Sequence, residues 1–374
     1  MFGVFSIATE SQKLHYKKVQ SILKELPWYV EEYIDHKRRN LSAASLLNYC
    51  LDYKIFFNWI VSEQLFTGHI RDIPLSLLDS LKTQQVDGFL YYLKYELSNK
   101  DITINRKLSA LKSLFNYLHN IAETGDLEPY IHRNVMGKIE FNDLNLNLET
   151  IANKMEGQIL MGDEYEKFRK FIAQDYGETV KENKKLSNFY QLNRERDTAI
   201  ISFILGSGLR LSEVVNLNID DIDFSKNSAR VIRKGNKEQY VYFSKLAADD
   251  LQEYLHIRES RYGVEKQNKA LFVAAAMGPK GKSRRLTGRS IENLVEKYAT
   301  AFGKPSLNVH KLRHSFATRY HAEINDVPKL RRQLGHSSIQ TTMIYTHIRN
   351  QDLKIAVDQM DIPNEYSENE NDDE

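Results

Sequence analysis

The second half of the chain contains polar side chains whose types suit attack on a phosphodiester. A guanidinium group stays charged and forks onto phosphate oxygens, so two arginines could stabilise the charge that builds on the phosphate during attack. Arg210 lies just after a glycine break, in GSGLRLSE, and Glu213 follows three residues later. Arg313 shares a predicted helix face with His310, in HKLRH. We therefore take Arg210 and Arg313 as the candidate phosphate-binding pair.

Three further residues complete a dispersed set. Lys234 lies in the turn RKGNK between two predicted strands, and LGHSSIQTTMIYTH supplies His336 and, nine residues later, Tyr345. Each has an ordinary explanation when it is taken alone, because a single arginine is usually a surface residue and a single tyrosine usually packs half-buried. Their common order along the chain is the feature that needs an explanation.

Several other kinds of site are absent or incomplete. The sequence has no HExxH, CxxC or GxGxxG motif. The GKS at 281–283 does not complete a phosphate-binding loop, because Ala276 stands where that loop needs glycine. His310 and His314 have a spacing that suits a metal ion, but no third ligand is evident. We expect no metal site, and we interpret His314 as a packing or helix-surface residue.

The segment around GKS is better explained as a basic loop. Such a loop could contact DNA phosphates or could simply be solvated. Its candidate DNA-binding residues are Lys280, Lys282, Arg284, Arg285 and Arg289.

The elements that must position the site are of mixed type. Helical periodicity is clear in several segments, and residues 222–243 predict two short strands around a glycine turn. A further short strand is expected within 271–275. The predicted helical segments are 197–217, with a break at its glycines, and 289–303, 310–323 and 326–335.

The first third of the chain predicts helices only. Ser42 could cap a helix that runs to about Gln64, and Pro74 precedes a helical stretch at 77–97. Thr103 could cap a helix over 104–123. Three basic residues are expected to lie off the apolar stripe of that helix, as phosphate contacts or as an ordinary solvated face. These further DNA-binding candidates are Arg106, Lys107 and Lys112.

Length and composition predict two domains. The chain has 374 residues, of which 41% are hydrophobic, and a domain usually takes ~100–200 residues. We expect a mainly α protein in which an all-helical domain precedes an α+β domain with a small antiparallel sheet. The expected boundaries are 1–126 for the helical domain, 127–160 for a polar linker, 161–360 for the second domain and 361–374 for an acidic disordered tail.

Composition also limits the compartment and the partners. No apolar run approaches the ~20 residues of a membrane span, and the first residues make a poor secretory signal. Cys50 is the only cysteine, so a reducing cytoplasm is the simplest location. The net charge of +2 includes an acidic tail, so the remaining body is basic and fits a polyanionic partner.

The dispersed set as a whole resembles the active-site pattern of the tyrosine recombinase, or phage integrase, family. The shared features are R-x-x-E, a lysine in a strand turn, H-x-x-R, L-G-H and a tyrosine nine residues after that histidine. TINRKLSALKSLFNYL is similar to the family's helical core-binding domain, which helps to clamp DNA. Residues 27–60 are most similar to the single-recombinase type of Xer protein.

The resemblance implies a role for each residue. Tyr345 would attack DNA and form a 3′-phosphotyrosine, although a phenol with a pKa of ~10 is a weak nucleophile without help. His336 would join the phosphate clamp, His310 would act as acid or base, and Lys234 would protonate the leaving 5′-oxygen. Glu213 would support the arginines, or it is a simple helix-surface residue. The ester keeps the bond energy, so the resemblance implies neither ATP, metal nor another cofactor.

The resemblance also implies partners and a biological role. These are a double-stranded DNA recombination site, a homotetramer on two such sites and the division DNA translocase FtsK, with resolution of chromosome dimers as the function. Residues 350–360 could form a helix that docks on a neighbouring protomer or packs on its own domain. An integrase of a mobile element is the alternative. A DNA-binding regulator without catalysis is a third hypothesis, against which the complete residue set argues.

Overall fold

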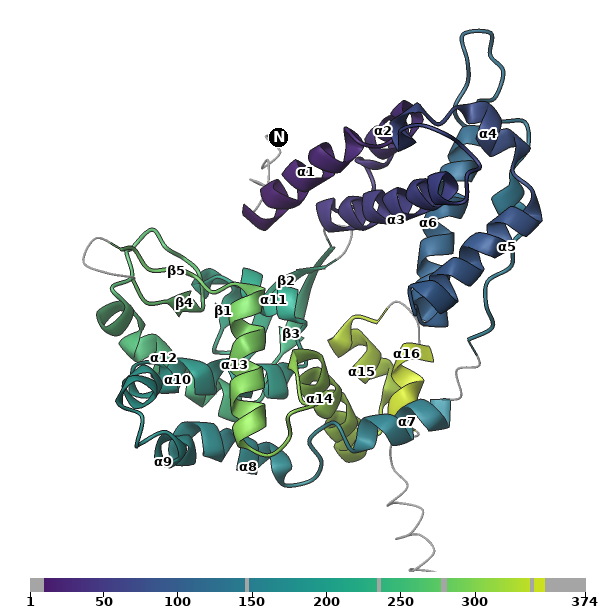
Figure 1. Ribbon diagram of the computed structural model, residues 1–374. Helices are drawn as coiled ribbons and strands as arrows, with labels where there is room; N and C mark the ends of the chain where they lie inside the picture. Colours follow the sequence, from purple (N-terminus) through teal and green to yellow (C-terminus); the bar gives the residue numbers. More distant parts are fainter. Residues whose placement is uncertain (1–9, 145–147, 234–236, 277–280, 337–339, 347–374) are drawn as a thin grey trace, which may run out of the picture. The chain divides into compact units, whose positions relative to one another are not determined.

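The computed structural model describes residues 10–144, 148–233, 237–276, 281–336 and 340–346. The chain divides into two compact units, Met1–Asn145 and Leu146–Glu374, each with its own hydrophobic core (Figure 1). Helices dominate both units, and the second unit adds small antiparallel sheets, so the fold is mainly α as predicted. No helix among the described residues is long and apolar enough to cross a membrane.

The first unit is a bundle of helices around an aromatic core. Helix α1 packs against α3, and α3 packs against α6. Ser42 caps α3, because its hydroxyl accepts a hydrogen bond from the Ser45 backbone N–H. Tyr29, Tyr33 and Phe56 are fully buried among these helices. The helices are α1 (Glu10–Leu23), α2 (Trp28–Lys37), α3 (Ala43–Ser62), η1 (Ile70–Asp72), α4 (Leu75–Ser80), α5 (Thr83–Tyr91), η2 (Tyr92–Glu96), α6 (Asp101–Asn120) and η3 (Val135–Lys138).

Two predicted helix boundaries in this unit are wrong. The stretch 77–97 is not one helix, because the backbone at Leu81 is extended and separates α4 from α5. Helix α6 begins at Asp101 after Lys100, so Thr103 lies inside the first turn and is not the cap. In both cases the local backbone conformation sets the helix boundary, and side-chain periodicity does not reveal that conformation.

The stretch expected as a linker, 127–160, is shared between the two cores. Ile131, Val135 and Met136 are buried in the core of the first unit. Ala152 and Ile159 are buried in the second unit, where α7 (Leu148–Glu156) packs against a short helix near the C-terminal end of the described chain. These few buried apolar residues are widely spaced in a polar stretch, and the composition of that stretch therefore predicts a linker.

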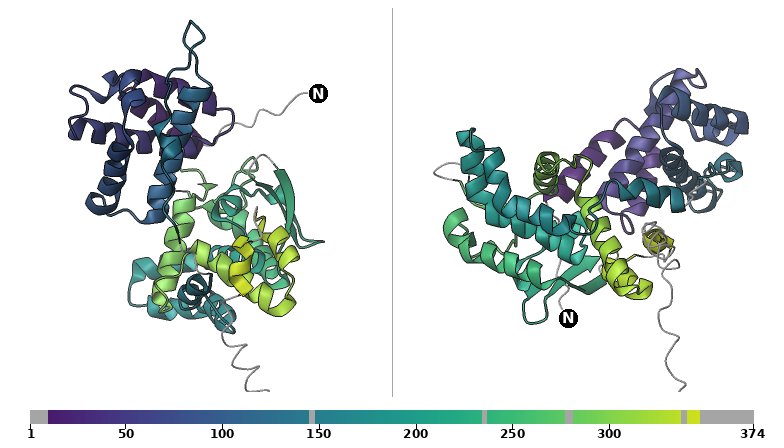
Figure 2. Two further views of the ribbon diagram at one scale, coloured as in Figure 1. Left: turned by 90° about the vertical axis from the view of Figure 1, so that its right-hand side faces the viewer. Right: turned by 90° about the horizontal axis from the view of Figure 1, so that it is seen from below.

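The second unit is built around α10 (Lys184–Ser207). Residues 197–205 of α10 are buried on every side, and a helix that is apolar nearly all round belongs in a core. Helices α12 and α14 pack against it (Figure 2). The other helices are α8 (Glu164–Lys170), η4 (Phe171–Asp175), α9 (Tyr176–Thr179), α11 (Leu211–Asn216), η5 (Ile219–Asp221), α12 (Lys245–Tyr262), α13 (Gly288–Ala301), α14 (Val309–Ile324), α15 (Val327–Leu334), α16 (Gln340–Met343) and η6 (Ile344–Thr346).

The three-stranded sheet has the antiparallel order β1-β2-β3. The strands are β1 (Ile222–Asp223), β2 (Ser228–Arg233) and β3 (Lys237–Tyr242), and a separate pair is formed by β4 (Val273–Ala274) and β5 (Arg284–Arg285). Ala229 pairs with Val241, and Val231 pairs with Gln239. Since side chains alternate between the faces of a strand, Arg233 shares the core-facing side with Ala229 and Val231.

Glycines end the two helices that lead into the candidate site. Helix α10 ends at Ser207, and Gly208 follows in the left-handed conformation with φ of +68°. Helix α15 ends at Leu334, and Gly335 has φ of +63°. A side chain at Gly208 would also clash, because a Cβ atom there would lie 2.4 Å from Cδ1 of Phe316. These ends expose backbone carbonyls that the site uses.

Gly208→Ala should therefore destabilise the second unit more than Gly263→Ala. Gly263 ends α12 with φ of +58° but has no atom within 4 Å of its notional Cβ. We expect a loss of about 1–2 kcal/mol from backbone strain at either position. Overpacking should add about 1–3 kcal/mol at Gly208. Urea denaturation of both variants checks this difference, and equal losses would contradict the steric role of Gly208.

Candidate active site

Arg313 is the most buried charged residue of the candidate site. It lies in the second turn of α14, whose start is capped by the Asn308 side chain. Only 2% of Arg313 is exposed. Its Nη1 donates to the Gly208 carbonyl at 2.6 Å, and its Nη2 donates to the Leu334 carbonyl at 2.7 Å. Burial, followed by the charge of Arg210, lowers the pKa of Arg313 to about 10.

Arg210 binds the carbonyl of Gly335, which is the next one along the chain after that of Leu334. Its Nη2 donates to the Gly335 carbonyl at 3.0 Å, while its Nη1 and its backbone N–H bind the two oxygens of Glu213, each at 2.9 Å. Arg210 and Arg313 are thus held at consecutive carbonyls at the end of α15. Glu213 is buried and holds Arg210, so it is not a simple helix-surface residue.

Backbone carbonyls at helix ends, rather than carboxylates, accept most of the side-chain hydrogen bonds of Arg210 and Arg313. The C-terminal end of a helix carries a partial negative charge, equivalent to roughly half an elementary charge. The carbonyls of Gly208 and Leu334 lie at two such ends. Partial charges neutralise the guanidinium groups only in part. The site therefore retains a surplus of positive charge that an anion could use.

His336 directly follows the two carbonyls. Its Nδ1 lies 3.0 Å from the hydroxyl of the buried Thr342, in α16, which leaves Nε2 for another partner. Burial, then the charges of Arg313 and Arg210, lowers the pKa of His336 to about 4. His336 is therefore neutral near pH 7 in this state and can donate one N–H to a phosphate.

Tyr345 is in η6 and is almost completely buried, with 1% exposed. Its hydroxyl lies 2.7 Å from Nδ1 of His314 in a hydrogen bond. Ala152 of α7 and Leu330 of α15 belong to the same core cluster. Burial raises the pKa of Tyr345 to about 12, although Arg313 and Arg210 act in the opposite direction. The phenol is thus protonated and shielded from solvent.

His314, which we interpret from the sequence as a packing or helix-surface residue, lies beside the candidate nucleophile. Its ring packs edge-on against that of His310, with 4.2 Å between centroids, and it also bonds Tyr345. Burial, then the nearby His310 and Arg313, lowers the pKa of His314 to about 3. The pKa of the exposed His310 is also lowered, by desolvation and then by Arg313 and Arg210. The spacing of the two histidines was visible in the sequence, but the partner lies 31 residues away from His314.

The structure thus brings Arg210, Glu213, Arg313 and His336 together at the ends of α10 and α15. His310 and Tyr345 both contact His314, the residue that follows Arg313 in α14. Lys234 and Lys280 lie outside the described residues. The described residues contain no cluster of three or more metal-ligating side chains.

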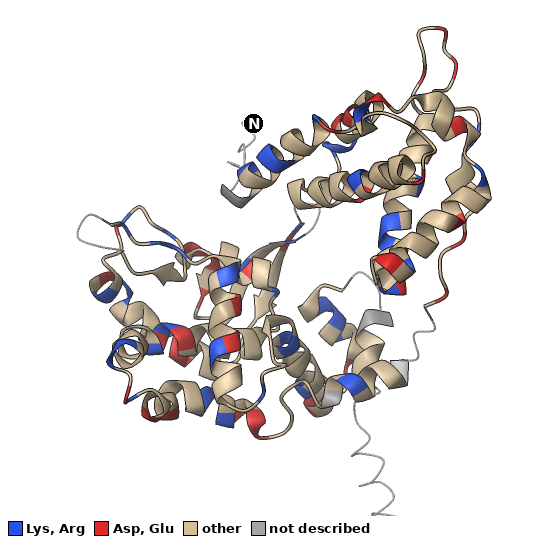
Figure 3. Ribbon diagram, in the orientation of Figure 1, with Lys and Arg blue, Asp and Glu red and all other residues tan. Residues whose placement is uncertain are grey.

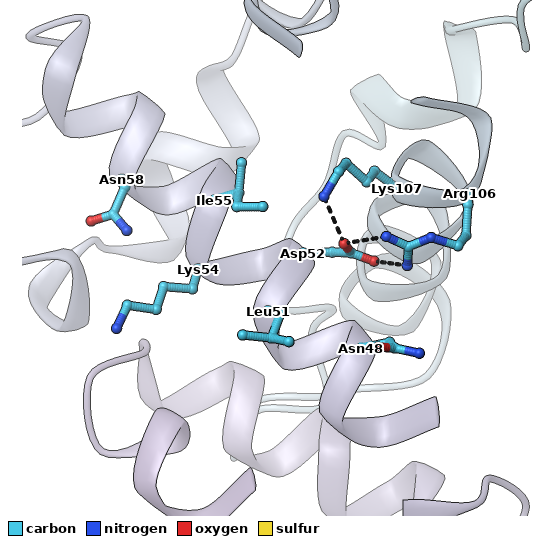
Figure 4. A pocket seen from close by; sticks show the side chains of 8 residues that line it. All are labelled: Asn48, Leu51, Asp52, Lys54, Ile55, Asn58, Arg106 and Lys107. Carbon is cyan, nitrogen blue, oxygen red and sulfur yellow. Dashed lines mark hydrogen bonds and ion pairs between the residues drawn. The ribbon is translucent and has the colours of Figure 1, made fainter. Parts of the chain in front are cut away.

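Two candidate DNA-binding residues of the first unit serve an internal ion pair. Asp52 of α3 is buried and accepts two hydrogen bonds from Arg106, at 2.5 and 2.8 Å, and one from Lys107 at 3.1 Å. Lys107 is buried, so the expectation that it lies off the apolar stripe is wrong. Figure 4 shows these groups in a surface pocket lined by Asn48, Leu51, Asp52, Lys54, Ile55, Asn58, Arg106 and Lys107.

The other basic candidates differ in their exposure and in the partners that the structure gives them. Lys112 donates to the Met136 carbonyl. Arg285 turns inward and donates to the carbonyls of Val215 and Leu217, so it ties loops together. Lys282 and Arg289 are mostly exposed, beside Glu265 and Glu292 respectively. Arg284 is exposed as well. Lysines and arginines occur on helices of both units (Figure 3).

The depressed histidine pKa values predict acid sensitivity. Below pH 6.5 the unfolded chain protonates His314, whereas the folded protein does not until about pH 3, so stability falls with pH across that interval. Between pH 7 and 5 this should cost about 2 kcal/mol for His314 alone. His314→Asn should reduce the loss by that amount in urea denaturation. His256→Asn, at an exposed position on α12, is the control, and parallel curves for all three proteins would contradict the assignment.

Comparison with known proteins relates the sequence of this chain to one family. The model of the phage integrase family matches residues 179–352. The tyrosine recombinase XerS of Streptococcus gordonii is 36% identical over 360 residues, which cover 93% of this chain and 99% of that protein. XerS of Lactococcus lactis is 36% identical over 357 residues, which cover 92% of this chain and 98% of that protein.

Solved structures agree on the fold. The post-cleavage complex of the XerH site-specific recombinase with a palindromic difH substrate has a TM-score of 0.64 at 21% identity, covering 95% of this chain and 92% of that chain. A lambda integrase dimer bound to a COC′ core site has a TM-score of 0.55 at 13% identity, covering 86% and 95%. Together with the full-length similarity to XerS, these findings establish that the chain belongs to the tyrosine recombinase family, whose members cut and rejoin DNA at specific sites through a tyrosine nucleophile.

Proposed function

We propose that this chain recombines a specific double-stranded DNA site through Tyr345 and thereby resolves chromosome dimers at cell division, in the cytoplasm. The observation that carries the proposal is the placement of Arg313 and Arg210 on the consecutive carbonyls of Leu334 and Gly335, directly before His336. Two fixed cations and a neutral imidazole at one point form a receptor for a phosphodiester.

Electrostatics favours a phosphate as the ligand of this receptor. In the described part of the chain, each of the two guanidiniums donates two side-chain hydrogen bonds to protein, and a guanidinium has five N–H groups. Phosphate oxygens can accept from the others. An anion between the arginines would also relieve the repulsion that helps to lower the pKa of Arg313. Groups preorganised in this way can each accelerate a reaction by ~10²–10³.

The proposed step balances without a cofactor. The Tyr345 oxygen attacks phosphorus, a new P–O bond to tyrosine forms, and the bond to the 5′-oxygen breaks. The phenolic proton passes to a histidine, with His310 as the proposed acid–base group beside His314. Lys234 supplies the proton that the 5′-oxygen takes. Rejoining is the reverse of this step, so no ATP or metal is required.

Tyr345 must leave its buried position before it can react. Its hydroxyl is bonded to His314 and its pKa is raised to about 12, so attack is suppressed in this arrangement. We propose that binding of DNA moves η6 and brings the phenol toward the arginines, whose charge favours the phenolate. The resting arrangement would then protect the cell from unscheduled cleavage.

The biological role rests on the relatives. The chain aligns with XerS proteins over nearly their whole length, so the role of a single recombinase acting on the chromosome is the one we propose. The XerH structures were solved on difH DNA, which supports a DNA recombination site as the ligand here. A homotetramer on two sites and the translocase FtsK are the proposed partners. The integrase of a mobile element is the alternative, and lambda integrase shares the fold at 13% identity, whereas XerS proteins are 36% identical over nearly the whole chain.

Tyr345→Phe should abolish covalent attachment to DNA. On a nicked suicide duplex the wild-type protein should form a covalent complex that survives denaturing electrophoresis, and the variant should form none, because the attacking oxygen is absent. Tyr320→Phe is the matched control, since Tyr320 packs against the same core cluster. A wild-type protein that binds the duplex but never becomes linked to it would contradict the proposal and favour a DNA-binding regulator.

Lys234→Ala should slow cleavage in a way that depends on the leaving group. On an ordinary phosphodiester the loss should be about 10²–10⁴-fold, the usual contribution of a general acid. A 5′-bridging sulfur leaves as a thiolate without a proton, so most of the loss should disappear on that substrate. Lys237→Ala, at an exposed position on the same hairpin, should not distinguish the substrates. Equal losses for Lys234→Ala on both would remove Lys234 from the acid role.

A further inference from the structure

Arg233 is a partly buried cation that the family pattern does not include. It is the last residue of β2, and only 9% of its side chain is exposed. Its Nη1 donates to Oε1 of Gln239 at 2.7 Å, and its Nη2 donates to the Gln333 carbonyl at 2.9 Å. Its Nε lies 3.2 Å from Oε1 of Glu213 as an ion pair without hydrogen-bond geometry. One guanidinium thus joins β2, β3, α11 and α15.

Arg233 contacts two groups that position the phosphate receptor, which consists of Arg210, Arg313 and His336. Oε1 of Glu213, beside Arg233, is also the oxygen that accepts from Nη1 of Arg210. On the other side, the guanidinium lies directly against Gly335, where a Cβ atom would come within 1.6 Å of Nη1. Gly335 supplies the carbonyl that binds Arg210, and His336 is the next residue. Arg233 therefore touches the group that holds Arg210 and the turn that carries His336.

Stability alone is a poor explanation for a charge at this place. Burial lowers the pKa of Arg233, and the positive charge of Arg210 lowers it further, so the folded protein incurs a cost to keep both cations. Replacing a buried ion by an apolar side chain of similar size is often neutral or stabilising when its partners remain satisfied. Because Arg233 and Arg210 share one carboxylate, Glu213 cannot neutralise either fully. The charge of Arg233 keeps the receptor positive.

We infer that Arg233 is a positioning residue for the recombination reaction, holding Glu213 and the 333–336 turn so that Arg210 and His336 face the same scissile phosphate. The inference rests on the proposed phosphate-receptor role of Arg210. Arg233 acts through these neighbours and need not touch the DNA.

A change in the charge of the substrate tests this role. A methylphosphonate at the scissile position is neutral and no longer needs a cation to balance a charged oxygen. Single-turnover formation of the covalent complex is measured on suicide duplexes with either linkage. Arg233→Met keeps the length of the side chain and removes the charge. We expect it to be slowed about 10–100-fold on the phosphodiester but less than about 3-fold on the methylphosphonate.

Matched variants separate positioning from folding. Arg230→Met removes a partly exposed arginine from the opposite face of β2 and should match wild type on both substrates. Arg233→Lys keeps the charge without the fork and should lie between wild type and Arg233→Met on the phosphodiester. It also provides the measurement if Arg233→Met does not fold. Equal losses of the Arg233 variants on both substrates, or no loss, would overturn the inference.

A reference variant distinguishes failure of this inference from failure of the proposed function. Arg210→Ala should be slowed strongly on the phosphodiester and much less on the methylphosphonate. If Arg210→Ala shows this pattern and the Arg233 variants do not, Arg210 binds the phosphate and Arg233 is merely structural. If Arg210→Ala loses equally on both substrates, the phosphate receptor itself is wrong, and the inference about Arg233 is overturned with it.

Discussion

The site depends on an imbalance of charge around one buried carboxylate. Arg210 and Arg233 both lie against Glu213, while in the described part of the chain the guanidinium of the nearby Arg313 donates to two backbone carbonyls. Such a group would be unstable as a closed core, because buried cations need compensation. It becomes favourable when an anion completes it. Burial, and then the charges of neighbouring arginines, lowers the pKa values of Arg313 and His336, so an anion at this place would favour their protonated forms.

The fold supplies part of the compensation for these cations with helix ends. Helix α10 ends at Ser207 and α15 ends at Leu334. The carbonyls of Gly208 and Leu334 accept hydrogen bonds from Arg313, and the carbonyl of Gly335 accepts one from Arg210. Carbonyls fix the direction of a guanidinium without cancelling its charge, whereas carboxylates would cancel it. The two glycines are therefore part of the site's electrostatics as well as of its backbone geometry. Tyr345 lies in the core cluster that includes Ala152 of α7, and its hydroxyl is hydrogen-bonded to His314.

Sequence analysis found the residues that follow a fixed order and missed those that act through distant contacts. Arg210, Arg313, His336 and Tyr345 could be selected because their types and order form a pattern, and the mainly α fold followed from periodicity. His314 was assigned to packing because its partner, Tyr345, is 31 residues away. The sequence predicts DNA contacts or a solvated surface for Lys107 and Arg285, because basic residues on loops and helices look alike in sequence, yet their partners are Asp52 and backbone carbonyls.

The most direct test of the charge imbalance is the position of the scissile phosphate in a structure of the Tyr345→Phe protein bound to a duplex that carries its recombination site. The account predicts non-bridging oxygens within about 3 Å of the guanidinium nitrogens of both Arg210 and Arg313, with the His336 ring beside them. A complex in which Arg313 keeps only its carbonyl partners, and the nearest phosphates contact surface lysines alone, would contradict it.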